Sequence, residues 1–352
     1  MTAPSLAPAP APCPWRVGQL PSGELDTICD VPGVTVGHVT LDDRSVQTGV
    51  TVLRAHSGSH YLHKVPAAAT VINGFGKSVG LMQLDELGVL ETPIALTNTF
   101  SVPAVAQAQI SQAIQLHPEI GRAWPTVNPL VFECNDGYLN DIQAMRVSKE
   151  DYQKAYEIAD KVFEQGAVGA GRGMSCFGLK GGIGSASRLV TIDSVAYTVG
   201  ALVLSNFGKR PNLTVLGQPV GQRMTESASS TEQTQTEKGS IIIVLATDAP
   251  LDARQLRRLS ARAAVGLART GSYFGHGSGD IAIAFSTAYK IPALPVEPMP
   301  LIACLHETRL ESLFEAVADT TEQAILSSLW HAESVTGRSD HRRDSLRTIF
   351  PT

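Results

Sequence analysis

Residues 236–250 read TEKGSIIIVLATDAP, and the character of the chain changes abruptly within this stretch. The run before it, QRMTESASSTEQTQTEKG at 222–239, is almost wholly polar, whereas SIIIVLA from Ser240 onward is almost wholly apolar. A short apolar run rich in β-branched residues predicts a strand covered on both faces. The polar run 221–238 is typical of a linker or surface loop. The junction therefore puts a serine at the first position of a buried strand.

A serine in that position is a poor nucleophile unless a base lies beside it. If the Gly239–Ser240 peptide bond were cut, the freed α-amino group of Ser240, with an ordinary pKa of about 7.7 to 8, would be such a base. The serine can make the cut itself by attacking the preceding carbonyl, which gives an ester that water hydrolyses. Glycine at 239 favours the attack because it has no Cβ. A Gly-Ser pair is common, however, and a surface loop that meets a strand is the plain alternative.

The segment SYFGHGSGDIAIAFS at 272–286 adds specificity to this hypothesis. Ser278 and Asp280 alternate with glycines ahead of an apolar strand, so both side chains can reach into a cleft at little steric cost. The Ser278 hydroxyl is a candidate partner for the amine or oxygen of Ser240. Asp280 is a candidate to hold the ammonium or to orient Ser278, as the third member of a triad orients its base. The spacing alone also fits a turn in which Ser and Asp cap backbone groups.

Helical periodicity is clearest in four segments. In 148–166, Ser148 and Asp151 form a capping pair and Gly166 supplies a stop signal. The other three helices are expected within 103–118, 250–271 and 307–334. The last segment is long enough for two helices or one bent helix.

Strands are expected where short runs of β-branched and apolar residues are bounded by Gly, Asn or Asp. These runs are RLVTI (188–192), AYTVGALVLSN (196–206), NLTVLG (212–217), SIIIVLA (240–246) and IAIAFS (281–286). Several are apolar without alternation, which favours an α/β fold with sheet packed on sheet and helices outside. The helix between the last two runs predicts a strand–helix–strand unit.

Composition limits the class of protein. The chain has 352 residues and is therefore long enough for one large or two medium domains. Its residues are 43% hydrophobic and 17% charged. Because the formal net charge is -5, nothing indicates a nucleic-acid partner. Residues 1–21 are rich in Pro and Ala and lack the pattern of a secretory signal, so a flexible arm is expected. No run approaches the ~20 apolar residues of a membrane helix.

The cysteines and histidines indicate whether a metal or cofactor is expected and which compartment suits the protein. The five cysteines are widely spaced without a CxxC pair, and the nine histidines show no HExxH motif, so neither a metal nor an organic cofactor is expected. An odd number of scattered cysteines favours reduced thiols in a cytoplasm, and a periplasmic location stays open.

Residues 239–288 resemble the D-aminopeptidase (DmpA) and β-peptidyl aminopeptidase (BapA) family, peptidase family S58. The resemblance extends over roughly 22–349 in the family's order. It is carried by DVPGVTVGHVTL (30–41), GVTVL (49–53), INGFGKSVGLMQLDELGVLETPIALTNTF (72–100), ECNDGYLNDI (133–142), GAVGAGRGMSCFGLKGGIGSASR (166–188) and ALVLSNFG (201–208).

The resemblance implies a self-processed serine aminopeptidase with a four-layer αββα sandwich. Its architecture is similar to that of N-terminal nucleophile hydrolases, with different connectivity. One catalytic domain, 22–352, is expected, cut between Gly239 and Ser240 into chains 1–239 and 240–352. Family members are also similar in forming homotetramers.

The resemblance also implies roles for single residues. Ser240 matches the nucleophile, and Ser278 with Asp280 match the hydroxyl and acid pair. Asn206 matches an asparagine at the oxyanion hole, where a side-chain amide can donate to the developing charge. Tyr138 matches a tyrosine that lines the site.

Three further residues bear on the mechanism and on substrate choice. Glu133 is the candidate anchor for the substrate's free ammonium group, with Asp136 and Asp141 as neighbouring alternatives. Asp280 is one methylene shorter than the glutamate associated with some β-aminopeptidases. Arg172 stands in a glycine-rich stretch where a smaller residue is expected, and it bears on substrate choice only if it lines the pocket.

The sequence offers three alternatives to this function. GAVGAGRG (166–173) and GGIGS (181–185) resemble phosphate cradles, but a dinucleotide fingerprint needs a strand before its glycines and a helix after them, and here the glycines follow a helix. An acyltransferase of the ornithine acetyltransferase type is expected to use threonine where this chain has Ser240. Loss of activity is disfavoured by the joint presence of Ser240, Ser278, Asp280 and Asn206.

The sequence therefore predicts a hydrolase that removes an unblocked N-terminal residue from small peptides, amides or esters. Whether that residue is an L-α, D-α or β-amino acid stays open, because one methylene in a pocket is worth only ~1 to 3 kcal/mol.

Overall fold

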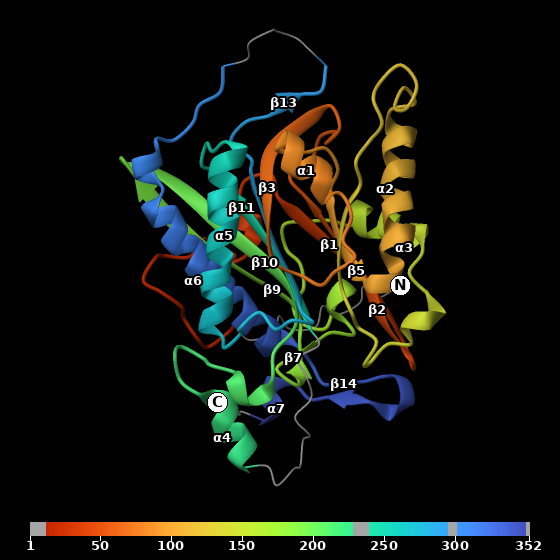
Figure 1. Cartoon of the computed structure of the whole chain (residues 1–352), viewed down its shortest axis with the longest axis vertical. Coiled ribbons are helices and arrows are strands. Elements are labelled where there is room, and N and C mark those ends of the chain that lie inside the picture. The colour runs from red at the N-terminus through yellow and green to blue at the C-terminus, as the bar shows by residue number, and fades with distance from the viewer. Residues whose placement is uncertain (1–11, 228–238, 295–300, 350–352) are drawn as a thin grey trace, which may run out of the picture.

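The computed structural model describes residues 12–227, 239–294 and 301–349. Two β-sheets lie at the centre, and helices cover their outer faces (Figure 1). None of the helices in the described ranges combines the length and apolarity that a bilayer-spanning segment requires.

The larger sheet has the strand order β13-β3-β12-β11-β10-β9, with β4 attached to β3. Its strands are β3 (His63–Gly74), β4 (Val89–Leu90), β9 (Gly182–Ile192), β10 (Val195–Asn206), β11 (Ser240–Thr247), β12 (Gly279–Ser286) and β13 (Ile291–Pro292). The smaller sheet has the order β1-β2-β5-β6. Its strands are β1 (Thr35–Asp43), β2 (Val46–Arg54), β5 (Ile94–Asn98) and β6 (Leu130–Cys134).

The remaining elements are two small ribbons and the helices. The ribbons pair β7 (Ser175–Cys176) with β8 (Leu179–Lys180), and β14 (Val335–Thr336) with β15 (Arg342–Arg343). The helices are α1 (Leu81–Leu87), α2 (Val102–Leu116), α3 (Lys149–Glu157), α4 (Val220–Ser227), α5 (Ala253–Arg269), α6 (Glu311–His331) and α7 (Leu346–Ile349).

Strand β11 shows how the layers are built. Successive side chains of a strand point to opposite faces of the sheet. Ile242 and Val244 pack in the core shared with the smaller sheet, whereas Ile241 and Ile243 pack in the core under helices α5 and α6. All four side chains are fully buried, as predicted for a strand covered on both faces. On the far side, α2 and α3 cover the smaller sheet (Figure 1). The predicted four-layer αββα arrangement is therefore confirmed.

The expected strand–helix–strand unit is also present. Strands β11 and β12 pair in parallel, and α5 connects them. Asp252 caps the start of α5 and exchanges hydrogen bonds with Gln255 in a capping box. Leu256 and Leu259 are buried on the face that packs toward the sheet. Because a parallel pair needs such a crossover, α5 brings the beginnings of β11 and β12 to the same edge of the sheet.

Some local predictions were wrong, and tertiary contacts explain them. The helix that begins after Ser148 has the predicted capping box but ends at Glu157 rather than near Gly166, because the following residues turn away to pair the backbone of Asp160 with that of Val36. The segment 212–217 is a turn rather than a strand.

Two other expectations are refined. Within 307–334, residues Glu311–His331 form one continuous helix, α6, which follows a short 3-10 turn at Glu307–Arg309. The polar run 221–238 begins with helix α4 rather than with a loop, and residues 228–238 lie outside the described residues.

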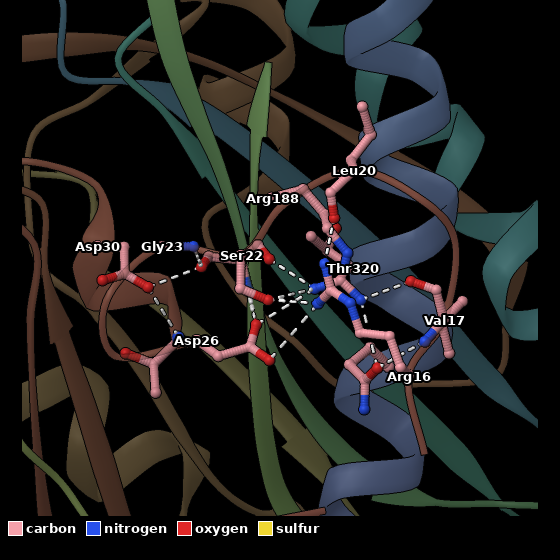
Figure 2. Close-up of polar contacts among 12 residues, drawn as sticks. Arg16, Val17, Leu20, Ser22, Gly23, Asp26, Asp30, Arg188 and Thr320 are labelled. Carbon is pink, nitrogen blue, oxygen red and sulfur yellow. Dashed lines mark hydrogen bonds and ion pairs between the residues drawn. The ribbon is translucent and has the colours of Figure 1, made fainter. Parts of the chain in front are cut away.

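The flexible arm expected over 1–21 is contradicted from Pro12 onward, while residues 1–11 lie outside the described residues. Val17 is 3% exposed, and its N–H donates to the Gln323 side chain of α6 at 2.9 Å. Its carbonyl accepts from the fully buried Arg188 of β9 at 2.8 Å. Figure 2 shows Arg188 at the centre of these contacts, where it also pairs with Asp26 at 3.2 Å. A buried guanidinium needs such partners, and they tie this segment to the domain.

Candidate active site

Ser240 is the first residue of β11 and is 7% exposed. Its hydroxyl donates to the carbonyl oxygen of Gly239 at 2.8 Å. The backbone N–H of Gly279 lies 3.2 Å from both Ser240 Oγ and Gly239 O. The carbonyl of the uncut Gly239–Ser240 bond is therefore contacted by the serine that would attack it and by a backbone donor.

The close approach of Gly279 to Gly239 and Ser240 requires glycine at both 239 and 279. A Cβ added to Gly239 would lie 2.6 Å from the carbonyl oxygen of Asn206 and from the Cα of Phe207. A Cβ on Gly279 would lie 2.5 Å from the carbonyl oxygen of Phe75 and 3.1 Å from Ser240 Oγ. Side chains at 239 or 279 would push these segments apart, so the close approach depends on glycine.

Strand pairing brings the neighbours of Ser240 together. Asn206, the last residue of β10, lies directly opposite Ser240 in the antiparallel β10–β11 pair. Gly279, the first residue of β12, lies opposite it in the parallel β11–β12 pair. The site is thus built at the end of the larger sheet where β10 ends and where β11 and β12 begin.

The Asn206 side chain is held at both ends. Its Oδ1 accepts from the Ser175 N–H at 2.8 Å, and its Nδ2 donates to the carbonyl oxygen of Asn135 at 3.0 Å. These two contacts determine which atom of the amide is oxygen and which is nitrogen. An amide nitrogen carries two N–H donors, so one remains beyond the bond to Asn135.

Ser278 and Asp280 contact each other directly. The Ser278 hydroxyl donates to Asp280 Oδ1 at 2.6 Å, and both residues are 1% exposed. The shorter acid at 280 therefore reaches Ser278. In the uncut chain the hydroxyl is directed at this carboxylate, and the next residue, Gly279, contacts Ser240. The sequence-predicted pair thus lies beside the predicted nucleophile.

A short loop, residues 75–77, connects Glu133 to this centre. The Phe75 N–H donates to the carbonyl oxygen of Ser278 at 3.3 Å, and the Lys77 N–H donates to Glu133 Oε1 at 2.8 Å. Thr99 also donates to the Glu133 carboxylate, which is 3% exposed. The contact at Glu133 and the contact beside Ser240 are thus made by residues two positions apart in this loop. Sequence reasoning missed this loop, and its only signal was the glycine-rich run INGFGK.

The loop that carries Tyr138 is hydrogen-bonded to Asn206. Tyr138 lies three residues beyond Asn135, whose carbonyl accepts from Asn206. Its side chain is 38% exposed, and its ring stacks on His341 with centroids 4.6 Å apart and planes 13° apart. The guanidinium carbon of Arg343 lies 3.7 Å from the ring centre. Sequence reasoning also missed these two partners, because nothing in RSDHRR at 338–343 indicates contact with Tyr138.

Comparison with known proteins identifies the family. Residues 26–343 match the sequence profile of Peptidase family S58. The chain belongs to peptidase family S58.

Curated proteins and solved structures that are similar to this S58 chain support the assignment to the family. It is similar to "Beta-peptidyl aminopeptidase BapA" of Sphingosinicella microcystinivorans, 38% identical over 90% of this chain and 84% of that one. Among solved structures, the PH0078 protein of Pyrococcus horikoshii OT3 aligns with a TM-score of 0.90 and 48% identity, covering 94% of each chain. The L-aminopeptidase D-Ala-esterase/amidase of Ochrobactrum anthropi aligns with a TM-score of 0.87 and 32% identity, covering 94% of this chain and 95% of that one. This S58 member is a hydrolase that acts as an aminopeptidase.

Two other carboxylates of this S58 chain were alternatives to Glu133. Asp136 is 1% exposed and accepts from Asn140 at 3.0 Å, and burial raises its pKa to about 7. Asp141 follows in the same loop, and its N–H donates to the carbonyl oxygen of Ser45 at 2.7 Å. Of the three carboxylates, Glu133 is the one that accepts from the loop beside Ser278.

Arg172 bridges distant segments of this S58 chain. Its guanidinium donates to Gln47 at 2.7 Å, to Asp42 at 2.6 Å and to Glu333 at 2.7 Å. Its side chain is only 12% exposed. The first two partners belong to the β1–β2 hairpin and the third follows α6, so Arg172 connects these elements rather than facing solvent.

A buried lysine, also missed by sequence reasoning, supports the strand that carries Ser175. Lys180 is 0% exposed, and its Nζ donates to the carbonyl oxygens of Gly171, Met174 and Gly181 at 2.7–2.9 Å. Burial lowers the pKa of this amine well below its usual value. The three contacts close the loop that positions Ser175 against Asn206.

Proposed function

We propose that Ser240 is the nucleophile of this aminopeptidase and that the chain produces it by cutting itself between Gly239 and Ser240. The single observation that carries the proposal is the 2.8 Å hydrogen bond from Ser240 Oγ to the carbonyl oxygen of Gly239. Attack of Oγ on that carbonyl carbon forms an ester and releases the α-amino group of Ser240. Water then hydrolyses the ester and leaves chains 1–239 and 240–352.

The charge that develops on Gly239 O during the attack is stabilised by the Gly279 N–H, 3.2 Å away in the uncut chain. No base is yet available from Ser240 itself, because its amino group is still part of the peptide bond. Ser278, one residue from Gly279 and hydrogen-bonded to Asp280, is the proposed group that moves the serine proton at this stage.

In the processed enzyme, the α-amino group of Ser240 takes the Oγ proton as Oγ attacks the substrate carbonyl. The second N–H of the Asn206 amide and the Gly279 N–H donate to the oxyanion. The ammonium then returns the proton to the leaving amine or alkoxide. Water, deprotonated by the same amino group, releases the acyl group and restores the serine. Ser278 and Asp280 hold the ammonium in place.

The substrates proposed are small peptides, amides or esters with an unblocked N-terminus. Glu133 would bind the free ammonium group of the first residue, because a buried carboxylate favours a cationic partner. The relatives are named for β-peptides and for L- and D-amino acid substrates. Turnover of the p-nitroanilides of L-Ala, D-Ala and β-Ala would rank the three classes for this chain.

The proposal also covers the oligomeric state of the protein and its cellular compartment. Four processed copies are expected to form a homotetramer, which native mass spectrometry would count. The five cysteines are free thiols, which supports a reducing compartment such as a cytoplasm.

The decisive experiment is intact mass under denaturing conditions, with Ser240→Ala as control. Chains 1–239 and 240–352, absent from the control, are the expected result. A single uncut chain from wild-type protein would overturn self-processing. Fully processed protein that turns over none of the three p-nitroanilides would count against the proposed substrates.

A further inference from the structure

The C-terminal hairpin, residues 335–343, is bonded to the loop that carries Tyr138. The backbone N–H of Arg338 donates to the carbonyl oxygen of Leu139 at 2.7 Å, and its Nε donates to that of Gly137 at 2.6 Å. Between them, His341 Nδ1 donates to the carbonyl oxygen of Tyr138 at 2.8 Å. The hairpin therefore binds three consecutive carbonyl groups of one loop.

The hairpin also contacts the Tyr138 ring itself. His341 stacks on the ring at 4.6 Å, and the Arg343 guanidinium carbon lies 3.7 Å from its centre. A cation over an aromatic face is attracted by the ring's negative charge density. Because both the backbone and the ring are contacted, the hairpin determines the place of the loop and the orientation of the side chain together.

Arg343 has a second contact that leads toward the nucleophile. Its Nε donates to Ser175 Oγ at 3.2 Å. The Ser175 N–H donates to the Asn206 side chain, and that side chain in turn donates to Asn135 at the start of the Tyr138 loop. Asn206 lies opposite Ser240. Arg343 thus touches the two segments that hold the Asn206 amide.

We propose that Arg343 and His341 are positioning residues of the active site, acting through Tyr138. The inference rests on the proposed function and on the sequence-based expectation that Tyr138 lines the site. After the cut between Gly239 and Ser240, Tyr138 belongs to one product chain and the hairpin to the other. The chain that carries the nucleophile therefore also sets the orientation of a site residue on its partner chain.

The test compares Arg343→Met with Arg343→Lys, using the p-nitroanilide that the wild type turns over best. Rates are divided by the processed fraction from intact mass. Removing the cation is expected to lower kcat by about 10-fold or more with little change in KM, since small misplacements of site groups cost on the order of 10- to 100-fold. Lysine keeps the cation over the ring and is expected to restore part of the rate.

The matched control is Arg342→Met, because Arg342 is the adjacent hairpin arginine, 57% exposed at the side chain and paired with Asp344 at 2.7 Å. Its rate is expected to equal that of the wild type. The decisive comparison makes Arg343→Met both in the wild type and in the Tyr138→Phe enzyme. If Arg343 acts through Tyr138, the two substitutions are not additive, and Arg343→Met costs less in the Tyr138→Phe enzyme.

Three results would overturn the inference while leaving the aminopeptidase assignment intact. They are an unchanged kcat in Arg343→Met, an unchanged kcat in Tyr138→Phe, and equal losses from Arg343→Met in both backgrounds. The last would mean that Arg343 acts independently of Tyr138, either through Ser175 and Asn206 or on the fold as a whole. A processed wild-type enzyme with no turnover would instead overturn the proposed function, and with it this inference.

Discussion

Asn206 and Ser240 lie directly opposite each other at the ends of the antiparallel strands β10 and β11. The Asn206 amide is held between Ser175 and Asn135, so it cannot rotate away without breaking two hydrogen bonds. Strand register thus places a fixed amide beside the proposed nucleophile. A slip of one residue would turn either side chain to the opposite face of the sheet.

Replacing Asn206 with Asp is expected to lower kcat by on the order of 100-fold, because it removes an amide donor of the proposed oxyanion hole. The variant keeps the acceptor for Ser175 and nearly the same shape. Turnover of the preferred p-nitroanilide per processed molecule measures the effect. Asn212→Asp, in a turn of the same chain, is the control. A kcat equal to that of the wild type would remove Asn206 from the mechanism.

Replacing Gly239 with Ala is expected to slow or abolish self-cleavage. The added Cβ would lie 2.6 Å from Asn206 O and would displace the carbonyl that Ser240 attacks. A time course of intact mass after synthesis measures the processed fraction. Gly58→Ala is the matched control, because the nearest atom to its added Cβ is a side-chain nitrogen 3.3 Å away. Processing at the wild-type rate in Gly239→Ala would show that the close approach is not needed.

Replacing Asp280 with Asn is expected to reduce turnover by about 100-fold, because the α-amino group that transfers the proton would lose the carboxylate that is proposed to hold it in place. The Ser278 hydroxyl would lose the charged acceptor that it contacts at 2.6 Å. Asp280→Glu keeps the charge and is expected to be more active than Asp280→Asn. Steady-state kinetics on processed protein distinguish them, and an Asp280→Asn enzyme as active as the wild type would contradict a role for the carboxylate.

Glu133→Gln tests the proposed ammonium site. The amide oxygen can still accept from the Lys77 N–H, and the amide nitrogen would donate to the Thr99 hydroxyl in place of the second carboxylate oxygen, so the loop is expected to stay in place. Loss of the negative charge is expected to raise KM for substrates with a free amine by about 10-fold, equivalent to ~1.4 kcal/mol. Asp141→Asn is the control. An unchanged KM would assign the ammonium to another group.

The pH dependence of stability tests the buried Asp136. Its pKa is raised from 3.8 to about 7, mainly by burial, so the folded state holds this proton more tightly than the unfolded state. Its contribution to stability is therefore largest below about pH 4 and is lost as pH rises through about 7. Asp136→Asn removes this dependence.

The stability of Asp136→Asn relative to wild type is expected to rise by up to about 3 kcal/mol as the pH goes from about 5 to about 8, because only the pH units below the folded pKa of about 7 contribute. Thermal midpoints of both proteins at the two pH values measure the difference. Asp141→Asn, in the same loop, controls for net charge. A constant difference between Asp136→Asn and wild type across this range would contradict a raised pKa.

Much of the fold followed from local patterns. The apolar run that forms β11, the amphipathic helix α5 with its Asp252 cap, and the start of α3 at Ser148 are each specified by residues close in sequence. Local patterns failed where a distant segment intervened. The helix expected to continue to Gly166 ends at Glu157, because Asp160 pairs with Val36 of β1.

The sequence by itself determined the two-faced burial of β11, the Gly-Ser junction at its start and the family, because these depend on residue types at neighbouring positions. Only the tertiary structure decided which carboxylate contacts the loop beside Ser278, and it showed the partners of Arg172, Arg188 and Tyr138. Glu133 and Asp136 are three residues apart, yet only Glu133 accepts from Lys77, while Asp136 is buried against Asn140. Arg343 and Tyr138 are separated by most of the chain. Such contacts depend on how whole layers pack, and no local periodicity encodes them.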